Sequence, residues 1–194
     1  MIFVRHGEGS WNTHFHKARI DAAIADPVLT ETGRCQARLA AEQLAEHGIK
    51  RLIASPYRRT LETAVIIAER LGLDIEVDPL VRERCAFSCD QGSPASVLAR
   101  LWPTIDFSGL EEIWWGRRIE SQASIDQRSR TFAAAMVRTA DWQLAAVVSH
   151  WGFIRASTGR SLGNAEIVRW AVSGQDAADE RPHGQQNRGS EKNE

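Results

Sequence analysis

Cysteine is scarce in this chain, and its few cysteines form no recognisable framework. The 194 residues include 3 cysteines, an odd number with no second cysteine pair and no nearby histidine cluster at zinc-ligand spacing. This pattern argues against a disulfide-stabilised secreted domain and against a zinc site. We therefore interpret Cys35, Cys85 and Cys89 as reduced thiols, which are typical of intracellular proteins.

The chain also lacks a long hydrophobic run and an excess of either charge. No segment approaches the roughly 20 apolar residues that a membrane span needs, and no charged segment with an apolar stretch precedes the first predicted strand. We therefore expect a soluble, cytoplasmic protein with no membrane partner. The 24 Lys and Arg residues nearly balance 25 Asp and Glu residues. Because no overall field attracts nucleic acid, we expect no nucleic-acid partner, and any preference for anions must be local.

Hydrophobic residues, in contrast, are plentiful enough for one core. They make up 43% of the chain, which suits one domain of ordinary size. We predict a single catalytic domain over residues 1–174. In residues 175–194 only two alanines are apolar, too few to offset the cost of ordering the segment. We therefore predict a disordered polar tail there.

Short β-branched segments alternate with longer helical segments along the chain. This alternation is typical of an α/β protein with a mainly parallel sheet. The predicted strands are 2–4, 51–54, 73–77, 144–148 and 167–172, and the predicted helices are 34–47, 55–71, 96–102, 124–139 and 152–159. Between 84 and 121 the periodicity is poor, and we predict an excursion on top of the sheet.

Chemically active residues follow four of the predicted strands. In chain order they are Arg5 and His6, then Ser55 to Arg59, then Glu83, then Ser149 and His150. Because ligands of parallel sheets bind beyond the carboxyl ends of the strands, we expect these side chains to meet at one rim.

The combination of arginine, histidine and carboxylate side chains suits a phosphate group. Arginines form charge-assisted, often bidentate hydrogen bonds to a dianion. A neutral imidazole can attack phosphorus. Neighbouring arginines disfavour imidazolium, so His6 should keep the lone pair that a nucleophile needs.

These residues lie within several motifs that have specific spacing. The motifs are RHGExxxN at 5–12, DPVLTETGRCQA at 26–37, SPYRRTLETA at 55–64 and SHWGFIR at 149–155, with Glu83 between the last two. In this order, over roughly residues 1–172, the chain resembles the histidine phosphatase superfamily, also called the phosphoglycerate-mutase-like family. The resemblance implies a three-layer sandwich in which helices flank a mainly parallel sheet.

The resemblance also implies a role for each of these groups. His6 would attack the phosphoryl group and form a phosphohistidine, with Arg5, Arg59 and His150 around the equatorial oxygens. Asn12 would donate a hydrogen bond to the same oxygens. The family's chemistry needs no metal, and we expect no cofactor.

The general acid is the least defined of the expected site residues. The resemblance makes Glu83 the group that protonates the leaving oxygen and then activates water, which calls for a raised pKa. Glu76 and Asp90 are alternative acids, and Glu83 could instead be a salt-bridge partner of a neighbouring arginine. The residues that follow Glu83 depart from the glycine and tryptophan-glycine pattern of many relatives.

Three functions are compatible with these residues. The leading hypothesis is a metal-independent phosphomonoester hydrolase that acts on a small phosphorylated metabolite or a phosphoprotein. The alternatives are a phosphoglycerate-type mutase and a catalytically silent module that recognises phosphate. Trp151 either shapes the pocket or packs beneath it, and Trp114 and Trp115 either belong to the core or cover the substrate. The sequence does not indicate an oligomeric state.

Overall fold

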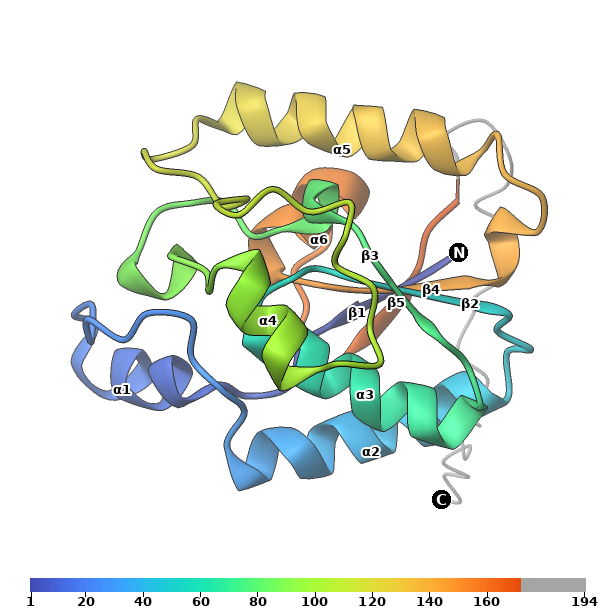
Figure 1. Ribbon diagram of the computed structural model, residues 1–194, viewed down its shortest axis with the longest axis horizontal. Coiled ribbons are helices and arrows are strands. Elements are labelled where there is room, and N and C mark those ends of the chain that lie inside the picture. The colour runs from blue at the N-terminus through green and yellow to red at the C-terminus, as the bar shows by residue number, and fades with distance from the viewer. Residues whose placement is uncertain (172–194) are drawn as a thin grey trace, which may run out of the picture.

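A five-stranded sheet runs through the centre of the molecule between two layers of helices (Figure 1). The computed structural model describes residues 1–171. The strands are β1 (Ile2–Arg5), β2 (Arg51–Ala54), β3 (Ile75–Val77), β4 (Ala145–Ser149) and β5 (Ile167–Arg169). Their order is β3-β2-β4-β1-β5, with β5 antiparallel to β1 and every other pair parallel. The predicted α/β fold with a mainly parallel sheet is confirmed.

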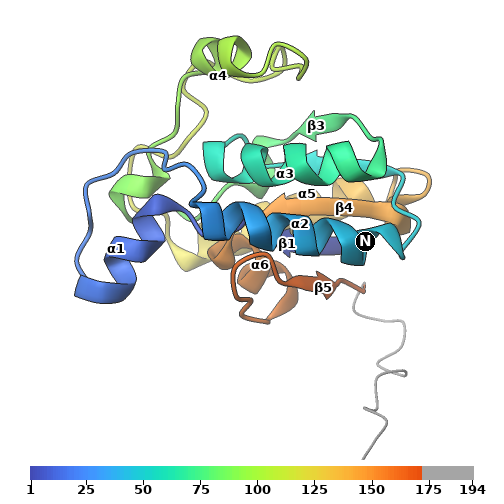
Figure 2. The ribbon, with the colours of Figure 1, turned by 90° about the horizontal axis from the view of Figure 1, so that it is seen from below.

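The helices cover both faces of the sheet and the end to which its parallel strands point. One face carries α2 (Glu31–Ala45) and α3 (Arg58–Leu71), and the other carries α5 (Gln122–Met136) and α6 (Trp151–Thr158) (Figure 1). The remaining α-helices, α1 (Ser10–Ala18) and α4 (Ala95–Leu101), lie beyond the carboxyl ends of the parallel strands and on the β3 side, respectively (Figure 2). Single turns of 3₁₀-helix occur at η1 (Pro79–Val81), η2 (Ser88–Asp90) and η3 (Trp142–Leu144).

Successive side chains of a strand point to opposite faces of the sheet, and this alternation divides the core into two halves. In β1, Ile2 and Val4 pack with the α2 and α3 side, whereas Phe3 and the preceding Met1 pack with the α5 and α6 side. The five residues of β4 are all fully buried, as expected for a strand covered by helices on both faces. The sheet is therefore a rigid platform from which the loops after β1, β2 and β4 project.

Several predicted boundaries differ from the structure by a few residues, among them the start of the helix after β2 and the end of the last strand. The helix predicted to start at Ser55 begins at Arg58, with Tyr57 as its N-cap, because the Ser55 hydroxyl contacts His150 rather than capping the helix. The last strand ends at Arg169, before the predicted end at Val172. That end and the tail predicted for 175–194 lie outside the described residues.

Helix α1 was not among the predicted elements. It places Trp11, Phe15 and Ala18 at positions i, i+4 and i+7, the spacing of one helical face. This signal is present in the sequence, but the mixture of histidines and polar residues around it obscures the pattern.

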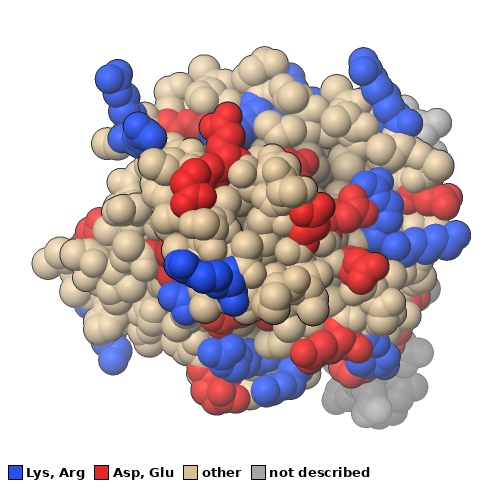
Figure 3. Space-filling model, viewed as in Figure 1, with Lys and Arg blue, Asp and Glu red and all other residues tan. Residues whose placement is uncertain are grey.

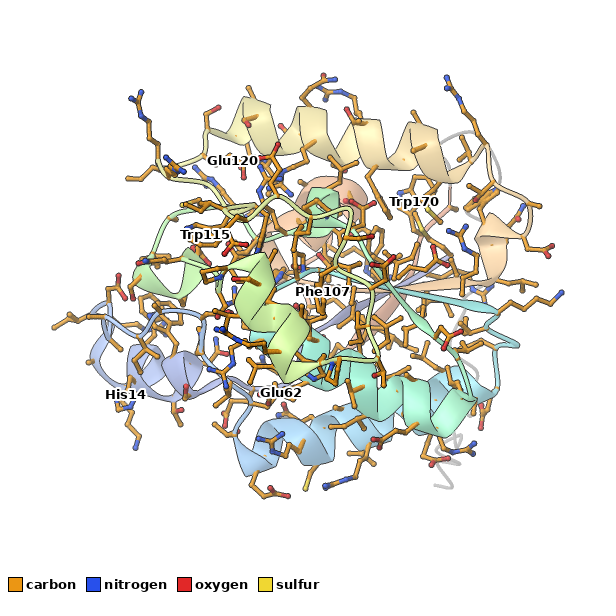
Figure 4. All side chains as sticks on the ribbon, in the orientation of Figure 1. His14, Glu62, Phe107, Trp115, Glu120 and Trp170 are labelled. Carbon is orange, nitrogen blue, oxygen red and sulfur yellow. The ribbon has the colours of Figure 1, made fainter. Side chains whose placement is uncertain are left out.

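The excursion between 84 and 121 lies mainly at the β3 side of the molecule rather than on top of the sheet (Figure 2). Its residues Leu98, Phe107 and Trp114 are buried in the core on the α3 side, and Figure 4 labels Phe107 and Trp115 in this segment. The predicted short helix is confirmed as α4. All three cysteines carry free thiols.

The surface shows no large field of one sign on the face drawn in Figure 3, where acidic and basic side chains are interspersed. Within residues 1–171, none of the helices is both long enough and apolar enough to cross a membrane.

A buried guanidinium on α5, that of Arg128, forms an ion pair with Glu120 and joins the helix to η1 and the residue that follows it. The Arg128 guanidinium donates to both carboxylate oxygens of Glu120, at 3.1 and 2.6 Å. It also donates to the carbonyl oxygens of Leu80 and Arg82, both at 2.7 Å. Figure 4 labels Glu120 at the approach to α5. One guanidinium therefore holds Glu120 together with the backbone that leads to Glu83, whose own carbonyl oxygen lies 3.4 Å away.

We predict that Arg128→Met lowers the free energy of unfolding by about 3–5 kcal/mol, because it leaves a buried carboxylate and two buried carbonyls without their donor. Urea unfolding measures this loss. Arg130→Met, on an exposed position of the same helix, is the matched control and should change stability by less than about 0.5 kcal/mol. Equal effects of the two substitutions would contradict the importance assigned to the pair.

Candidate active site

A cavity of about 490 Å³ lies at the carboxyl end of the parallel strands. Five of the six side chains expected at the site line it, and they are Arg5, His6, Asn12, Arg59 and Glu83. The sixth, His150, is fully buried directly behind His6, with the two ring centroids 5.1 Å apart. Segments far apart in the sequence thus bring the expected groups together.

The loop after β1 is held against its neighbours by backbone contacts. The His6 N–H donates to the Ser149 carbonyl at 3.0 Å, and the Gly7 N–H donates to the Thr63 hydroxyl at 3.1 Å. A Cβ at Gly7 would collide with the carbonyl of Gly33 in the first turn of α2. The close approach of the loop to α2 therefore requires glycine at both positions, and it fixes where His6 lies.

Hydrogen bonding determines which nitrogen of His6 is reactive. Its Nδ1 lies 2.7 Å from the Gly7 carbonyl oxygen. Because a carbonyl oxygen only accepts, Nδ1 must carry the proton, and the lone pair of the neutral ring is on Nε2. Burial, with Arg59 and Arg5 nearby, lowers the pKa of His6 well below its usual value. His6 is therefore a neutral imidazole with an available Nε2 at neutral pH.

Two arginines line the cavity beside this ring. Arg59, the second residue of α3, donates to the Cys89 carbonyl at 2.8 Å and contacts the Asp90 carboxylate at 3.4 Å. Arg5 donates to the Leu162 carbonyl at 2.7 Å, while its buried Nε has no hydrogen-bond partner among the described residues. These partners leave part of each guanidinium's charge unneutralised, so the inner end of the cavity suits an anion.

His150 is positioned by the segment that follows β2. Its Nε2 contacts the Ser55 hydroxyl at 2.8 Å, and its ring packs edge-on against Tyr57 at 5.0 Å. The Nδ1 of His150 is buried and has no partner within residues 1–171. Burial, and to a smaller extent the positive charge of Arg59, lowers the pKa of His150 well below its usual value. Tyr57 also lies beneath the Arg59 guanidinium at 4.4 Å, a positioning role that the sequence did not indicate.

Glu83 is held by two backbone N–H groups. Arg84 N–H donates to Oε1 at 2.8 Å, and Gly152 N–H donates to Oε1 and Oε2 at 3.0 and 3.2 Å. A Cβ at Gly152 would collide with Oε1, which explains the need for glycine after Trp151. Burial, together with the Asp90 carboxylate, raises the pKa of Glu83 despite these hydrogen bonds.

The two alternative acids lie in different surroundings. Glu76 is on β3 and forms a two-pronged ion pair with Arg51 at 2.8 and 2.6 Å, away from the cavity lining. Asp90 lines the cavity, but its carboxylate accepts N–H groups from Ala86 and Phe87 and contacts Arg59. Its contacts suit it to orient Arg59.

The outer part of the cavity is lined by four aromatic side chains, of which the sequence indicated only Trp151 as a candidate for the pocket. Trp11 and Phe15 come from α1, Phe87 from the segment before η2, and Trp151 from the start of α6. Trp151 thus shapes the pocket. Trp114 instead packs on Tyr57 at 4.6 Å in the core, and neither Trp114 nor Trp115 is part of the cavity lining.

Asn12 lies on α1 with its side-chain oxygen accepting the Gly9 N–H at 2.9 Å, which leaves its amide NH₂ as a donor. Across the described part of the chain, no three His, Cys, Asp or Glu side chains are grouped to hold a metal ion. The groups at the inner end are a neutral imidazole, two guanidinium groups and a carboxyl with a raised pKa.

Comparisons with known proteins agree with this arrangement. The chain is 44% identical over 83 residues to proteins named probable phosphoglycerate mutase GpmB from Serratia proteamaculans and Photorhabdus laumondii. Each match spans 43% of this chain and 37% of the relative's length.

Solved structures match over most of the chain. Mycobacterial glucosyl-3-phosphoglycerate phosphatase in complex with VO₃ is 27% identical, with a TM-score of 0.61 over 86% of this chain and 88% of that one. Phosphoserine phosphatase from Entamoeba histolytica, at 21% identity and a TM-score of 0.56 over 86% and 87%, shares the fold.

A family model described as Histidine phosphatase superfamily (branch 1) matches residues 1–178. With the fold and the motifs, this match shows that the chain belongs to the histidine phosphatase superfamily.

Proposed function

We propose that this protein is a phosphomonoester hydrolase that forms a phosphohistidine at His6. The observation that carries the proposal is the fixed tautomer of His6, whose Nε2 lone pair shares a cavity with Arg5, Arg59 and Glu83. A nucleophile, anion-binding guanidinium groups and a proton donor are the parts that phosphoryl transfer needs. The 27% identical mycobacterial phosphatase, whose structure holds VO₃, supports the same class of reaction.

In the first step, the phosphoryl group of the substrate binds at the inner end of the cavity. The Nε2 lone pair forms a bond to phosphorus, and the bond to the leaving oxygen breaks with its electron pair on that oxygen. Protonated Glu83 gives its proton to this oxygen, and an alcohol leaves. Arg5, Arg59 and Asn12 stabilise charge on the equatorial oxygens. We propose that His150 donates from a protonated Nδ1 to the same oxygens, with its Nε2 accepting from the Ser55 hydroxyl.

In the second step, water attacks the phosphohistidine. The Glu83 carboxylate takes a proton from this water as the new bond to phosphorus forms. The bond between Nε2 and phosphorus breaks, and its electron pair returns to the imidazole. Inorganic phosphate leaves, with His6 neutral and Glu83 protonated as at the start.

A mutase is the second candidate, because the relatives at 44% identity are named phosphoglycerate mutases. A mutase would return the phosphoryl group from His6 to a second hydroxyl instead of to water. The two reactions share the first step, so the site residues alone do not separate them.

We predict that His6→Ala abolishes release of phosphate from p-nitrophenyl phosphate, because the variant has no Nε2 lone pair. His14→Ala, on the exposed side of α1 (Figure 4), is the matched histidine control and should retain wild-type turnover. Vanadate should inhibit the wild-type protein. If wild type and His6→Ala bind phosphate but are equally inactive, the chain is a phosphate-recognition module.

We predict that Glu83→Gln slows turnover by roughly 10²–10⁴-fold through loss of the proton donor. In wild type, the raised pKa of Glu83 and the lowered pKa of His6 keep both groups in their active forms between those two pKa values. Therefore kcat/KM should fall as pH rises through the Glu83 pKa.

In Glu83→Gln, the fall of kcat/KM that is caused by ionisation of Glu83 should disappear. The fall that is caused by ionisation of the substrate should stay. Glu76→Gln, at the exposed ion pair on β3, is the carboxylate control. A wild-type pH profile in Glu83→Gln would move the acid to another residue.

We predict that ³²P-labelled 3-phosphoglycerate, if it is turned over, yields labelled inorganic phosphate and no 2-phosphoglycerate. Separation of the products by chromatography measures both. Labelled 2-phosphoglycerate as the main product would establish the mutase instead of the hydrolase.

A further inference from the structure

The cavity is much larger than the phosphate site at its inner end. Pockets of about 300–1,000 Å³ enclose whole small-molecule ligands, and this one measures about 490 Å³. The phosphoryl group of the substrate would occupy only the end of the cavity that contains His6 and the two arginines. The rest of the space must be filled by the leaving group of the substrate, so its lining should determine which phosphomonoesters bind.

Four aromatic side chains line this outer space, and we name them the aromatic wall: Trp11, Phe15, Phe87 and Trp151. Trp11 and Phe15 are stacked, with ring centroids 4.5 Å apart and an interplanar angle of 15°. Phe87 packs against both at 5.3 and 5.4 Å. Phe87 and Trp151 nevertheless remain 46% and 40% exposed, so the wall presents apolar surface that its own packing does not cover.

A carboxylate bridge holds two of the three segments of the wall together, α1 and the segment at η2. Asp21 accepts the Trp11 indole N–H at 2.9 Å and the Ser88 backbone N–H at 2.8 Å, and it also contacts the Ser88 hydroxyl. Hydrogen bonds from Ser88 and Trp11 lower the pKa of Asp21 to about 2. The bridge therefore persists at ordinary assay pH, and the wall is formed before substrate arrives.

The polar groups near the wall either already form hydrogen bonds within the protein or are positively charged. The two carboxylates of the lining, Glu83 and Asp90, accept backbone N–H groups. The Arg84 Nε donates to the Glu120 carbonyl, and the Arg19 guanidinium lies 5.9 Å from the centroid of Phe15. An amino group on the leaving alcohol would find guanidinium groups and carbon, an unfavourable combination.

We propose that the aromatic wall binds the leaving group, and that the preferred substrates are phosphomonoesters of alcohols that carry a planar, apolar ring. Such a ring packs on exposed faces or edges of Phe87 and Trp151, with aromatic pairs favouring offset or edge-on geometry. A small alcohol that carries an amine gains no such contact and meets guanidinium groups instead. This inference rests on the proposed hydrolase function and specifies its substrate class.

The test compares 2-naphthylmethyl phosphate with ethyl phosphate. Both leave as primary alkoxides, so a difference in kcat/KM reports contacts with the ring rather than a much better leaving group. We expect a preference for the naphthylmethyl ester of about tenfold or more. Phosphoserine, included as a small charged ester, should rank below it.

Substitutions in the wall should reduce that preference. Phe87→Ala and Trp151→Ala remove side chains that are largely exposed, so both variants should fold, and each should lower the naphthylmethyl-to-ethyl ratio several-fold. Ile119→Ala, at a position that is 77% exposed and outside the cavity lining, is the apolar control and should leave the ratio unchanged. A wild-type ratio near one would overturn the inference while leaving the hydrolase in place.

Binding to His6→Ala separates the two proposals, because this variant cannot form the phosphohistidine. By calorimetry, 2-naphthylmethyl phosphate should bind it about tenfold more tightly than ethyl phosphate, and adding Phe87→Ala should remove most of the difference. This result, combined with a wild-type protein that hydrolyses neither ester, would overturn the hydrolase and keep the aromatic subsite. Equal affinities would overturn the subsite.

Discussion

The hydrogen bond from His6 Nδ1 to the Gly7 carbonyl is the constraint on which the site depends. It determines the tautomer, and burial next to two arginines keeps the ring neutral, so the reactive lone pair exists without a separate base. The bond requires the loop after β1 to hold one conformation. That conformation in turn depends on the close contact of Gly7 with Gly33 in α2. A backbone contact outside the cavity lining therefore decides the tautomer of the imidazole.

Different backbone groups hold the positively charged and the negatively charged side chains of the site. Carbonyl oxygens of Cys89 and Leu162 hold the guanidinium groups of Arg59 and Arg5, whereas backbone N–H groups hold the carboxylate of Glu83. Neutral dipoles fix each charge in place without cancelling it. The exception is Asp90, whose negative charge both orients Arg59 and raises the pKa of Glu83.

The sequence predicted much of the sheet and the residues that follow its strands, because buried β-branched runs and strand-end chemistry are local signals. His6, Arg5 and Arg59 could be associated with one rim for that reason. The origin of the aromatic wall is different, since Trp11 on α1 and Phe87 before η2 are brought together by contacts of Asp21 that no local pattern encodes. Tyr57 likewise supports Arg59 and His150 through packing, which no spacing in the sequence encodes.

The position of β1 in the sheet has a consequence for biosynthesis. Residues 2–5 pair with β4, at 145–149, and with β5, at 167–169. These contacts have very large sequence separation, which slows folding. On the ribosome, the segment that carries the proposed nucleophile is made before its strand partners and gains them only after residues 145–169 have been synthesised. A nascent or prematurely terminated polypeptide therefore carries His6 on an unpaired strand, where it lacks the surroundings that make it reactive.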